Sequence, residues 1–148
     1  MKLTQLFYLP WWYFQIKFLR KKKPLQTVLF ISNHCNYACK HCCIDKTCKI
    51  EKSYEQIKSE LEYSYKLGSR FVDFEGGEPT FWKDGDKNIN DLCNLAKKIG
   101  FFTTTVTTNA SQDFSYLNAD HVFVSLDGIK NHDNIRCKGA FEKLKENI

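Results

Sequence analysis

Residues 27–42 have the sequence TVLFISNHCNYACKHC, in which an apolar run gives way to a loop rich in cysteine. The β-branched and apolar residues 27–32 predict a buried strand. Cys35, Cys39 and Cys42 follow it, at spacings that let three thiolates converge on one point. Three thiolate ligands leave one iron of a four-iron cubane open, whereas a structural zinc takes four closed ligands. The loop therefore predicts a metal site, with zinc as the alternative if His34 or His41 is a fourth ligand.

Downstream of this loop, strand-like and helix-like segments alternate. A capping-box pattern at Ser53 and Gln56 predicts a helix that ends at Gly68, and Asn88 and Gly100 bound a second helix. Further strands are predicted over 70–74, 101–107 and 121–126, with a short turn or helix over 114–117 and a last helix from about Gly139 to the end of the sequence. This alternation predicts an α/β fold of about four parallel βα repeats, arranged as a partial, incomplete TIM-like barrel.

Polar or glycine-containing segments follow each of the four predicted strands. Active groups of parallel βα folds gather at the carboxyl ends of the strands. Cys35, Gly76, Asn109 and Asp127 each follow a different strand at that end. We therefore expect the four segments to share one pocket.

Several motifs, in this order, resemble those of the radical S-adenosylmethionine (SAM) enzymes. Cys35, Cys39 and Cys42 match the C-x3-C-x2-C motif of that superfamily, and Gly76-Gly77-Glu78-Pro79 matches its GGEP segment. Thr107-Thr108-Asn109 is similar to its T-N-G, with Ala110 in place of the glycine. Residues 125–128, SLDG, resemble its S-x-D-G segment, and residues 132–136, HDNIR, resemble the H-D-x-I-R that follows.

The resemblance implies a [4Fe–4S] cluster on Cys35, Cys39 and Cys42, whose open iron chelates the amine and carboxylate of SAM. It implies reductive cleavage of SAM to a 5′-deoxyadenosyl radical, which abstracts hydrogen from an unknown substrate. Reduced ferredoxin or flavodoxin is the implied electron donor. The other implied cofactor contacts are the methionine amine for Gly76, Gly77 and Glu78 with the adjoining Pro79, ribose hydroxyls for Ser125 and Asp127, the adenine for His41, and a less defined contact for Asn109.

The resemblance extends from residue 27 to residue 148 and ends after four βα units, whereas such cores usually have about six. We therefore expect residues 27–148 to be a truncated core: a fragment, a short paralogue, or half of a barrel completed by a partner chain. The family is one of enzymes, of oxidoreductase or transferase type. The alternatives are a non-catalytic module that binds cluster or SAM and works with a partner chain, and a zinc-stabilised α/β binding domain.

Residues 1–26 form a separate basic and aromatic extension. They carry six basic residues and no acidic one, whereas the remaining residues have a net charge of −1. Because the basicity is confined to this extension, no nucleic-acid partner is expected. A helix is predicted from Pro10 to about Lys22, with Tyr13, Lys17, Arg20 and Lys21 on one face. It would lie at a membrane surface, or pack against the domain with its lysines in solvent.

The remaining composition agrees with a single globular domain. Apolar residues make up 43% and charged residues 26% of the 148 residues, which excludes disordered and collagen-like chains. Seven cysteines are too few and oddly counted for a disulfide scaffold, so reduced thiols and a cytoplasmic location are expected. Cys43, Cys48, Cys93 and Cys137 are interpreted as non-ligands, Glu75 as a strand-end acid, and His121 and His132 as solvent-side residues. Arg136 either contacts a carboxylate or pairs with a surface acid.

Overall fold

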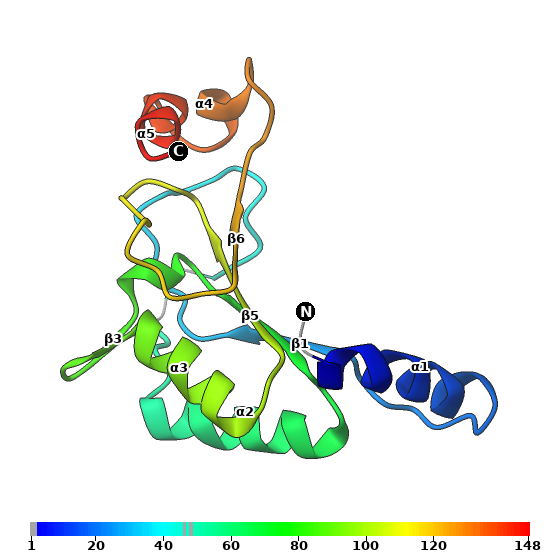
Figure 1. Ribbon diagram of the computed structural model, residues 1–148. Coiled ribbons are helices and arrows are strands. Elements are labelled where there is room, and N and C mark those ends of the chain that lie inside the picture. Colours follow the sequence, from blue (N-terminus) through cyan, green and yellow to red (C-terminus); the bar gives the residue numbers. More distant parts are fainter. Residues whose placement is uncertain (1–2, 46, 48) are drawn as a thin grey trace.

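A computed structural model describes residues 3–45, 47 and 49–148, and it contains a four-stranded parallel sheet (Figure 1). The strands are β1 (Gln26–Phe30), β2 (Phe71–Glu75), β5 (Thr103–Thr108) and β6 (His121–Val124), in the order β1-β2-β5-β6. Each neighbouring pair is parallel. The predicted α/β class with parallel strands is confirmed, and the sheet is consistent with part of a TIM-like barrel.

Two helices, α2 (Tyr54–Leu67) and α3 (Ile89–Ile99), cover one face of the sheet (Figure 1). Both begin with the capping box expected from the sequence, at Ser53 and at Asn88. Both end at a glycine in the left-handed conformation, Gly68 and Gly100, where a residue with a side chain would be strained. Local capping chemistry therefore sets the limits of both helices.

The hydrophobic core lies between these helices and the sheet. Residues that alternate along the strands point into it, as a period of two requires. The fully or almost fully buried members are Leu29, Ile31, Ile57, Leu61, Val72, Phe74, Trp82, Ile89, Leu92, Cys93, Ala96, Phe101 and Val106. Trp82 also donates from Nε1 to the carbonyl of Lys52 at 2.9 Å, so its one polar atom is paired inside the core.

The opposite face of the sheet has a mixed character. In β2, Asp73 and Glu75 point to this face, and Asp73 is only 4% exposed. The hydroxyl of Thr107 in β5 donates to both carboxylate oxygens of Asp73, at 3.1 and 3.3 Å. At the sides of this face, Phe30 of β1 and Phe123 of β6 are exposed. Carboxylates thus occupy the middle of a surface that is apolar at its margins.

Several short elements were not expected from the sequence. A 3-10 turn η1 (Pro79–Phe81) precedes a small antiparallel hairpin of β3 (Lys83–Asp84) and β4 (Lys87–Asn88). A short helix α4 (His132–Ile135) precedes α5 (Ala140–Glu146), the predicted last helix. The expectation that His132 faces solvent is wrong. Its ring is fully buried, and its Nδ1 accepts a hydrogen bond from the backbone N–H of Asp127.

The N-terminal helix also differs from the prediction. α1 spans Leu3–Lys17, so it begins before Pro10 and ends before Arg20. Arg20 has a positive φ in the turn that follows, and therefore does not continue the predicted basic face of the helix. No helix in the described part of the chain is long and apolar enough to cross a membrane.

Burial in the core sets the first testable expectation. Replacing Leu61 with Ala should lower the free energy of unfolding by about 2–5 kcal/mol, because it leaves a cavity beneath a fully buried side chain. Tyr63 lies on the exposed side of the same helix, and Tyr63→Ala should change stability by no more than about 0.5 kcal/mol. Urea unfolding of the two variants measures both values, and equal losses would contradict the assigned packing of α2.

Candidate active site at the carboxyl ends of the strands

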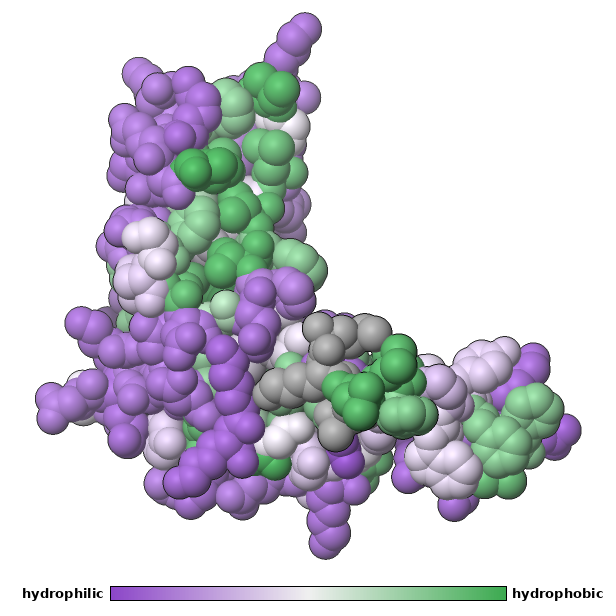
Figure 2. All heavy atoms as spheres, viewed as in Figure 1, coloured by the Kyte–Doolittle hydropathy of each residue, from purple (hydrophilic) through white to green (hydrophobic). Residues whose placement is uncertain are grey.

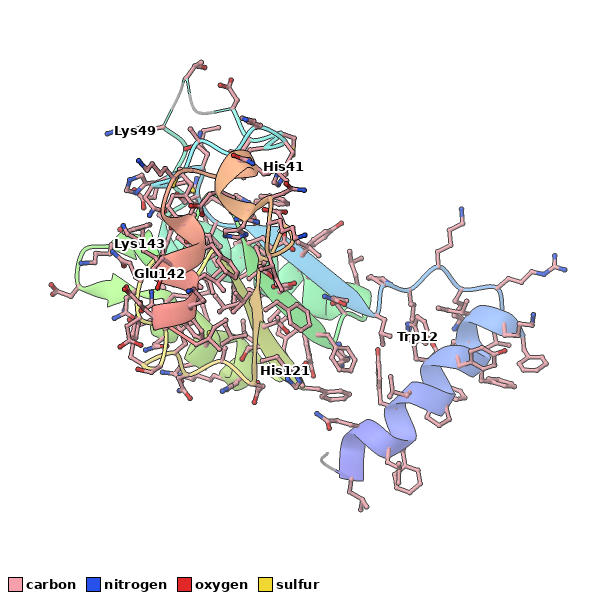
Figure 3. All side chains as sticks on the ribbon, turned by 90° about the horizontal axis from the view of Figure 1, so that it is seen from above. Trp12, His41, Lys49, His121, Glu142 and Lys143 are labelled. Atoms are coloured by element: carbon pink, nitrogen blue, oxygen red, sulfur yellow. The ribbon has the colours of Figure 1, made fainter. Side chains whose placement is uncertain are left out.

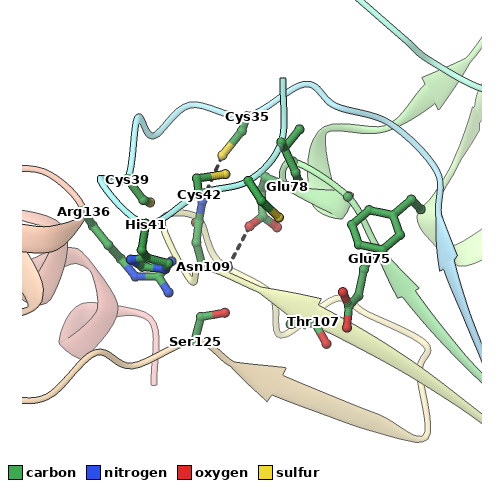
Figure 4. Close-up of a pocket in the computed structure, with 15 residues that line it drawn as sticks. Cys35, Cys39, His41, Cys42, Glu75, Glu78, Thr107, Asn109, Ser125 and Arg136 are labelled. Carbon is green, nitrogen blue, oxygen red and sulfur yellow. Dashed lines mark hydrogen bonds between the residues drawn. The ribbon is translucent and has the colours of Figure 1, made fainter. Parts of the chain in front are cut away.

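One cavity lies at the carboxyl ends of the strands, and the cysteine loop covers it (Figure 4). Its wall includes nine of the eleven residues predicted as site residues: Cys35, Cys39, His41, Cys42, Gly76, Gly77, Glu78, Asn109 and Ser125. The loop after β1, the segment after β2 and the ends of β5 and β6 all contribute. The expectation that separate motifs share one pocket therefore agrees with this geometry.

Backbone pairing fixes where the cysteine loop starts and returns. The loop closes between residues 31–33 and 50–52, where Asn33 N donates to the carbonyl of Ile50 and Lys52 N to that of Ile31. On the other side, Gly77 N donates to the carbonyl of Ser32 and Glu78 N to that of His34, both at 2.8 Å. The first cysteine therefore leaves from a segment held on both sides.

Glycine is required at 76 and 77 by this pairing. A Cβ on Gly77 would lie 2.1 Å from the carbonyl oxygen of His34, and a Cβ on Gly76 would lie 2.4 Å from that of Ser32. Neither distance is possible for a real side chain, and both obstacles are backbone atoms. The glycines thus permit the close approach of two chain segments, in addition to any approach of a ligand.

Glu78 is a buried carboxylate at the centre of the site. It is 1% exposed, and it accepts hydrogen bonds from Thr108 Oγ1 and from the backbone N–H of Asn109, both at 2.7 Å. It also accepts from the hydroxyl and the backbone N–H of Thr80. With four donors on its two oxygens, the carboxylate joins the segment after β2 to the end of β5.

Asn109 continues this network to the cysteines. Its Nδ2 donates to Asn36 Oδ1 at 3.0 Å and lies 3.8 Å from the sulfur of Cys35 (Figure 4). Asn36 in turn donates to the hydroxyl of Ser111. The side chain predicted as a cofactor contact is thus the one that anchors the first cysteine.

At the far end of the site, Arg136 lies beside the cavity with Asp127. The Arg136 Nε donates to Asp127 Oδ2 at 2.5 Å, and Nε2 of His41 is 4.0 Å from the other oxygen of this carboxylate. Arg136 lines the cavity, whereas Asp127 and Pro79 are not among the residues that line it. The loop is tied to the same region, because Lys40 N donates to the carbonyl of Ile135.

The thiols differ in their surroundings. Cys42 and Cys43 are exposed, and both line the cavity together with Cys35 and Cys39. As they stand, no three His, Cys, Asp or Glu side chains among the described residues are close enough to hold a metal ion. Burial raises the pKa of Cys93 to about 11, so this thiol stays protonated in the core. Cys48 lies outside the described residues.

Two acidic groups of β2, Asp73 and Glu75, were not predicted as site residues. Glu75, set aside as a strand-end acid, lines the cavity. Burial raises the pKa of Asp73, and burial together with the charge of Asp73 raises the pKa of Glu75. The available signal in the sequence was the alternation of these acids with the apolar Val72 and Phe74. It places Asp73 on the same face of the sheet as Glu75, which opens onto the site.

Comparison with known proteins points to one family. The model of the radical SAM superfamily matches residues 29–148. The Fe-coproporphyrin III synthase of Methanosarcina barkeri is 31% identical over 139 residues, which cover 86% of this chain and 33% of that protein. Crystal structures of Streptococcus suis SuiB bound to the precursor peptide SuiA and to SAM have TM-scores of 0.63 and 0.62 at 22% identity. They cover 77% of this chain, which matches 27% and 28% of SuiB.

The buried carboxylate should be essential to the folded site. Glu78→Gln places an amide N–H₂ against backbone and hydroxyl donors, and we expect a loss of about 2–4 kcal/mol in the free energy of unfolding. The matched change at an exposed position of α2, Glu62→Gln, should cost no more than about 0.5 kcal/mol. Urea unfolding tests this, and a Glu78→Gln variant as stable as the parent would show that the carboxylate does not hold the two segments together.

Asp73 should make stability depend on pH in the opposite sense to an ordinary carboxylate. A carboxyl with a raised pKa stabilises the fold below its ordinary pKa of 3.8, and this contribution is lost as pH rises through the raised value. Asp73→Asn should therefore be more stable than the parent at pH 7, and the difference should shrink in acid.

Asp113 provides the contrast, because hydrogen bonds from the backbone and side chain of Ser115 lower its pKa. Its contribution is present above its ordinary pKa and lost as pH falls, so Asp113→Asn should be destabilising at pH 7. Unfolding curves at several pH values measure both variants. Parallel curves for Asp73→Asn and the parent would contradict the assigned burial of Asp73.

Proposed function

Because the chain belongs to the radical SAM superfamily, we propose that residues 27–148 hold a [4Fe–4S] cluster and SAM at the cavity under the cysteine loop. Membership in this family implies both cofactors. The observation that carries the proposal for this chain is the shared cavity, to which the loop after β1, the glycines after β2 and the ends of β5 and β6 all contribute. The function proposed is reductive cleavage of SAM for hydrogen abstraction from a substrate.

Cys35, Cys39 and Cys42 are the proposed cluster ligands. All three line the same cavity, and three soft thiolates suit iron and leave one iron position without a protein ligand. The contacts of Asn109 hold the start of the loop, and a hydrogen bond from Cys42 N to the carbonyl of Cys39 closes the turn between the other two cysteines. When bound, the cluster supplies the one-electron reduction on which radical SAM chemistry depends. Reduced ferredoxin or flavodoxin is the proposed electron donor.

The proposed SAM contacts are the polar groups that line the cavity and do not already have all their hydrogen bonds within the protein. Gly76 and Gly77 line the cavity and offer backbone atoms, and Ser125 offers a hydroxyl. The carboxylate of Glu78 already accepts from four donors, so we assign its contact with SAM to the backbone. His41 remains the proposed neighbour of the adenine.

Asp127 and Arg136 are proposed to act as a pair. Asp127 accepts from Nε of Arg136, which leaves the outer nitrogens of the guanidinium to donate. Because Arg136 lines the cavity, those nitrogens suit the carboxylate of SAM. In this proposal Asp127 orients the arginine, and its predicted contact with the ribose is secondary.

The same site could serve a non-catalytic module that works with a partner chain. Among the residues that the structure describes, no helix covers the face of the sheet that carries Asp73, and the margins of this face expose Phe30 and Phe123. Within the described residues β6 pairs on one side only. A further polypeptide segment placed against this edge and face would bury the exposed rings.

The chain spans about a third or less of the length of the relatives above. One of these is named as a porphyrin synthase, and the other is seen with a precursor peptide. These names do not point to one common substrate, so the proposal for this chain is confined to the cofactors and the reaction type. In this proposal a substrate approaches the cavity from the open face of the sheet, which carries Asp73 and Glu75.

Anaerobic reconstitution with iron and sulfide tests the ligand set. The parent should bind about four irons per chain with broad visible absorption, and Cys39→Ala should lose both. The neighbouring pair gives the sharpest control: Cys42→Ala should lose the cluster, whereas Cys43→Ala, equally exposed, should keep it.

Four irons retained in Cys39→Ala would overturn the assignment, and one zinc per chain in the parent would favour the zinc-stabilised domain. Production of 5′-deoxyadenosine from SAM under reductant then separates the enzyme from the non-catalytic module.

A further inference from the structure

Helix α1 carries polar groups on the side that faces the rest of the protein. Gln5 and Gln15 are 7% and 4% exposed, and Gln5 Nε2 donates to the carbonyl of Phe102 at 3.2 Å. Between them, the hydroxyl of Tyr8 donates to the carbonyl of Gly68 and Trp12 Nε1 to that of Lys23. Figure 3 shows Trp12 on the helix. The spacing of these four residues by three or four places them on one face. Hydrogen bonds to loops thus attach the helix to the body of the protein.

The outward side of the helix is apolar along its length. Leu3, Phe7, Trp11, Phe14 and Phe18 recur at spacings of three or four and are all exposed, Phe7 by 69% and Trp11 by 55%. The rings of Trp11, Phe14 and Phe18 contact one another in sequence, with centroids 5.7 and 5.2 Å apart. Leu6 and Tyr13, seven positions apart, are also exposed and widen this stripe on one side. We call these residues the α1 stripe; it runs along an arm that projects from the body (Figures 1 and 2).

Cations follow directly after the stripe. Arg20, Lys21, Lys22 and Lys23 form the turn after α1 and, with Ile16 and Pro24, line a shallow hollow at the end of the arm. Residues 1–26 contain no acidic side chain. Within the described part of the chain, none of these four cations takes part in an ion pair.

We infer that the α1 stripe and the turn at residues 20–23 together bind the surface of an anionic lipid bilayer. An aromatic and aliphatic face with adjoining lysines is the composition of helices that lie in the interface between headgroups and acyl chains. Trp and Tyr are favoured there because one end of the ring is apolar and the other polar. The cations are attracted to anionic headgroups.

The shape and charge of the arm favour a bilayer over a protein partner. The stripe lies on a projecting ridge, which suits a soft planar surface, whereas a protein would need a matching groove (Figures 1 and 2). Lysines are depleted in protein–protein interfaces, but three adjoin the stripe here. A lipid surface accepts the apolar ridge and the cations at the same time.

Flotation of the full chain with lipid vesicles tests the inference. The protein should float with vesicles of phosphatidylcholine and phosphatidylglycerol and should remain unbound with phosphatidylcholine alone. The double variants Phe7→Ser/Trp11→Ser and Lys21→Gln/Lys22→Gln should each lower the affinity for these vesicles by about tenfold or more. Tyr63→Ser and Lys66→Gln remove an exposed aromatic ring and an exposed cation from α2 and should leave binding unchanged.

Tryptophan fluorescence with brominated lipids reports whether the stripe enters the bilayer. Trp82 is fully buried and Trp12 faces inward, so quenching should come from Trp11. It should disappear in Trp11→Phe and persist in Trp12→Phe. Flotation that the α1 variants do not weaken would overturn the inference. Binding to heparin as strong as binding to vesicles, without any quenching by the brominated lipids, would also overturn it. The same holds if the chain dimerises and the Phe7→Ser/Trp11→Ser variant abolishes the dimer.

Discussion

The arrangement of the site depends on a single buried carboxylate. Glu78 accepts hydrogen bonds from Thr108 and Asn109, which places the segment after β2 against the end of β5. Asn109 then donates to Asn36 and contacts Cys35, so the same network extends to the start of the cysteine loop. A carboxylate with four donors and almost no solvent exposure of its own is stable only while all its partners stay in place. The positions of the first cysteine and of the glycines are therefore coupled through one side chain.

Much of the fold could be predicted from the sequence, because local chemistry fixes it. The capping residues Ser53 and Asn88 and the terminal glycines set both large helices, and β-branched runs mark the parallel strands. The short hairpin around Gly85 and the helix α4 escaped prediction, since neither has enough residues to show a period. His132 looked polar and solvent-facing in the sequence, but the partner that buries it, the backbone N–H of Asp127, is a matter of tertiary structure.

The candidate site was predictable as a set of residues but not as a set of roles. The motifs identified the loop and the two glycines, and the structure brings them to one cavity. That Glu78 and Asn109 bind other parts of the protein is invisible in the sequence, because hydrogen bonds between β2 and β5 ends join residues 30 or more positions apart. The helix α1 shows the same limit: its sequence is apolar almost all round, and only packing reveals that the glutamines are the buried side.

The backbone of Gly76 and Gly77 packs directly against the backbone of residues 32–34. Since the carbonyl of His34 occupies the space where a side chain on Gly77 would lie, the cysteine loop and the glycine segment form one mechanical unit from two distant parts of the chain. A chimera that transplants the cysteine loop alone into another scaffold would lack the surface on which it rests. A transplant would therefore have to include both the cysteine loop and the segment with Gly76 and Gly77.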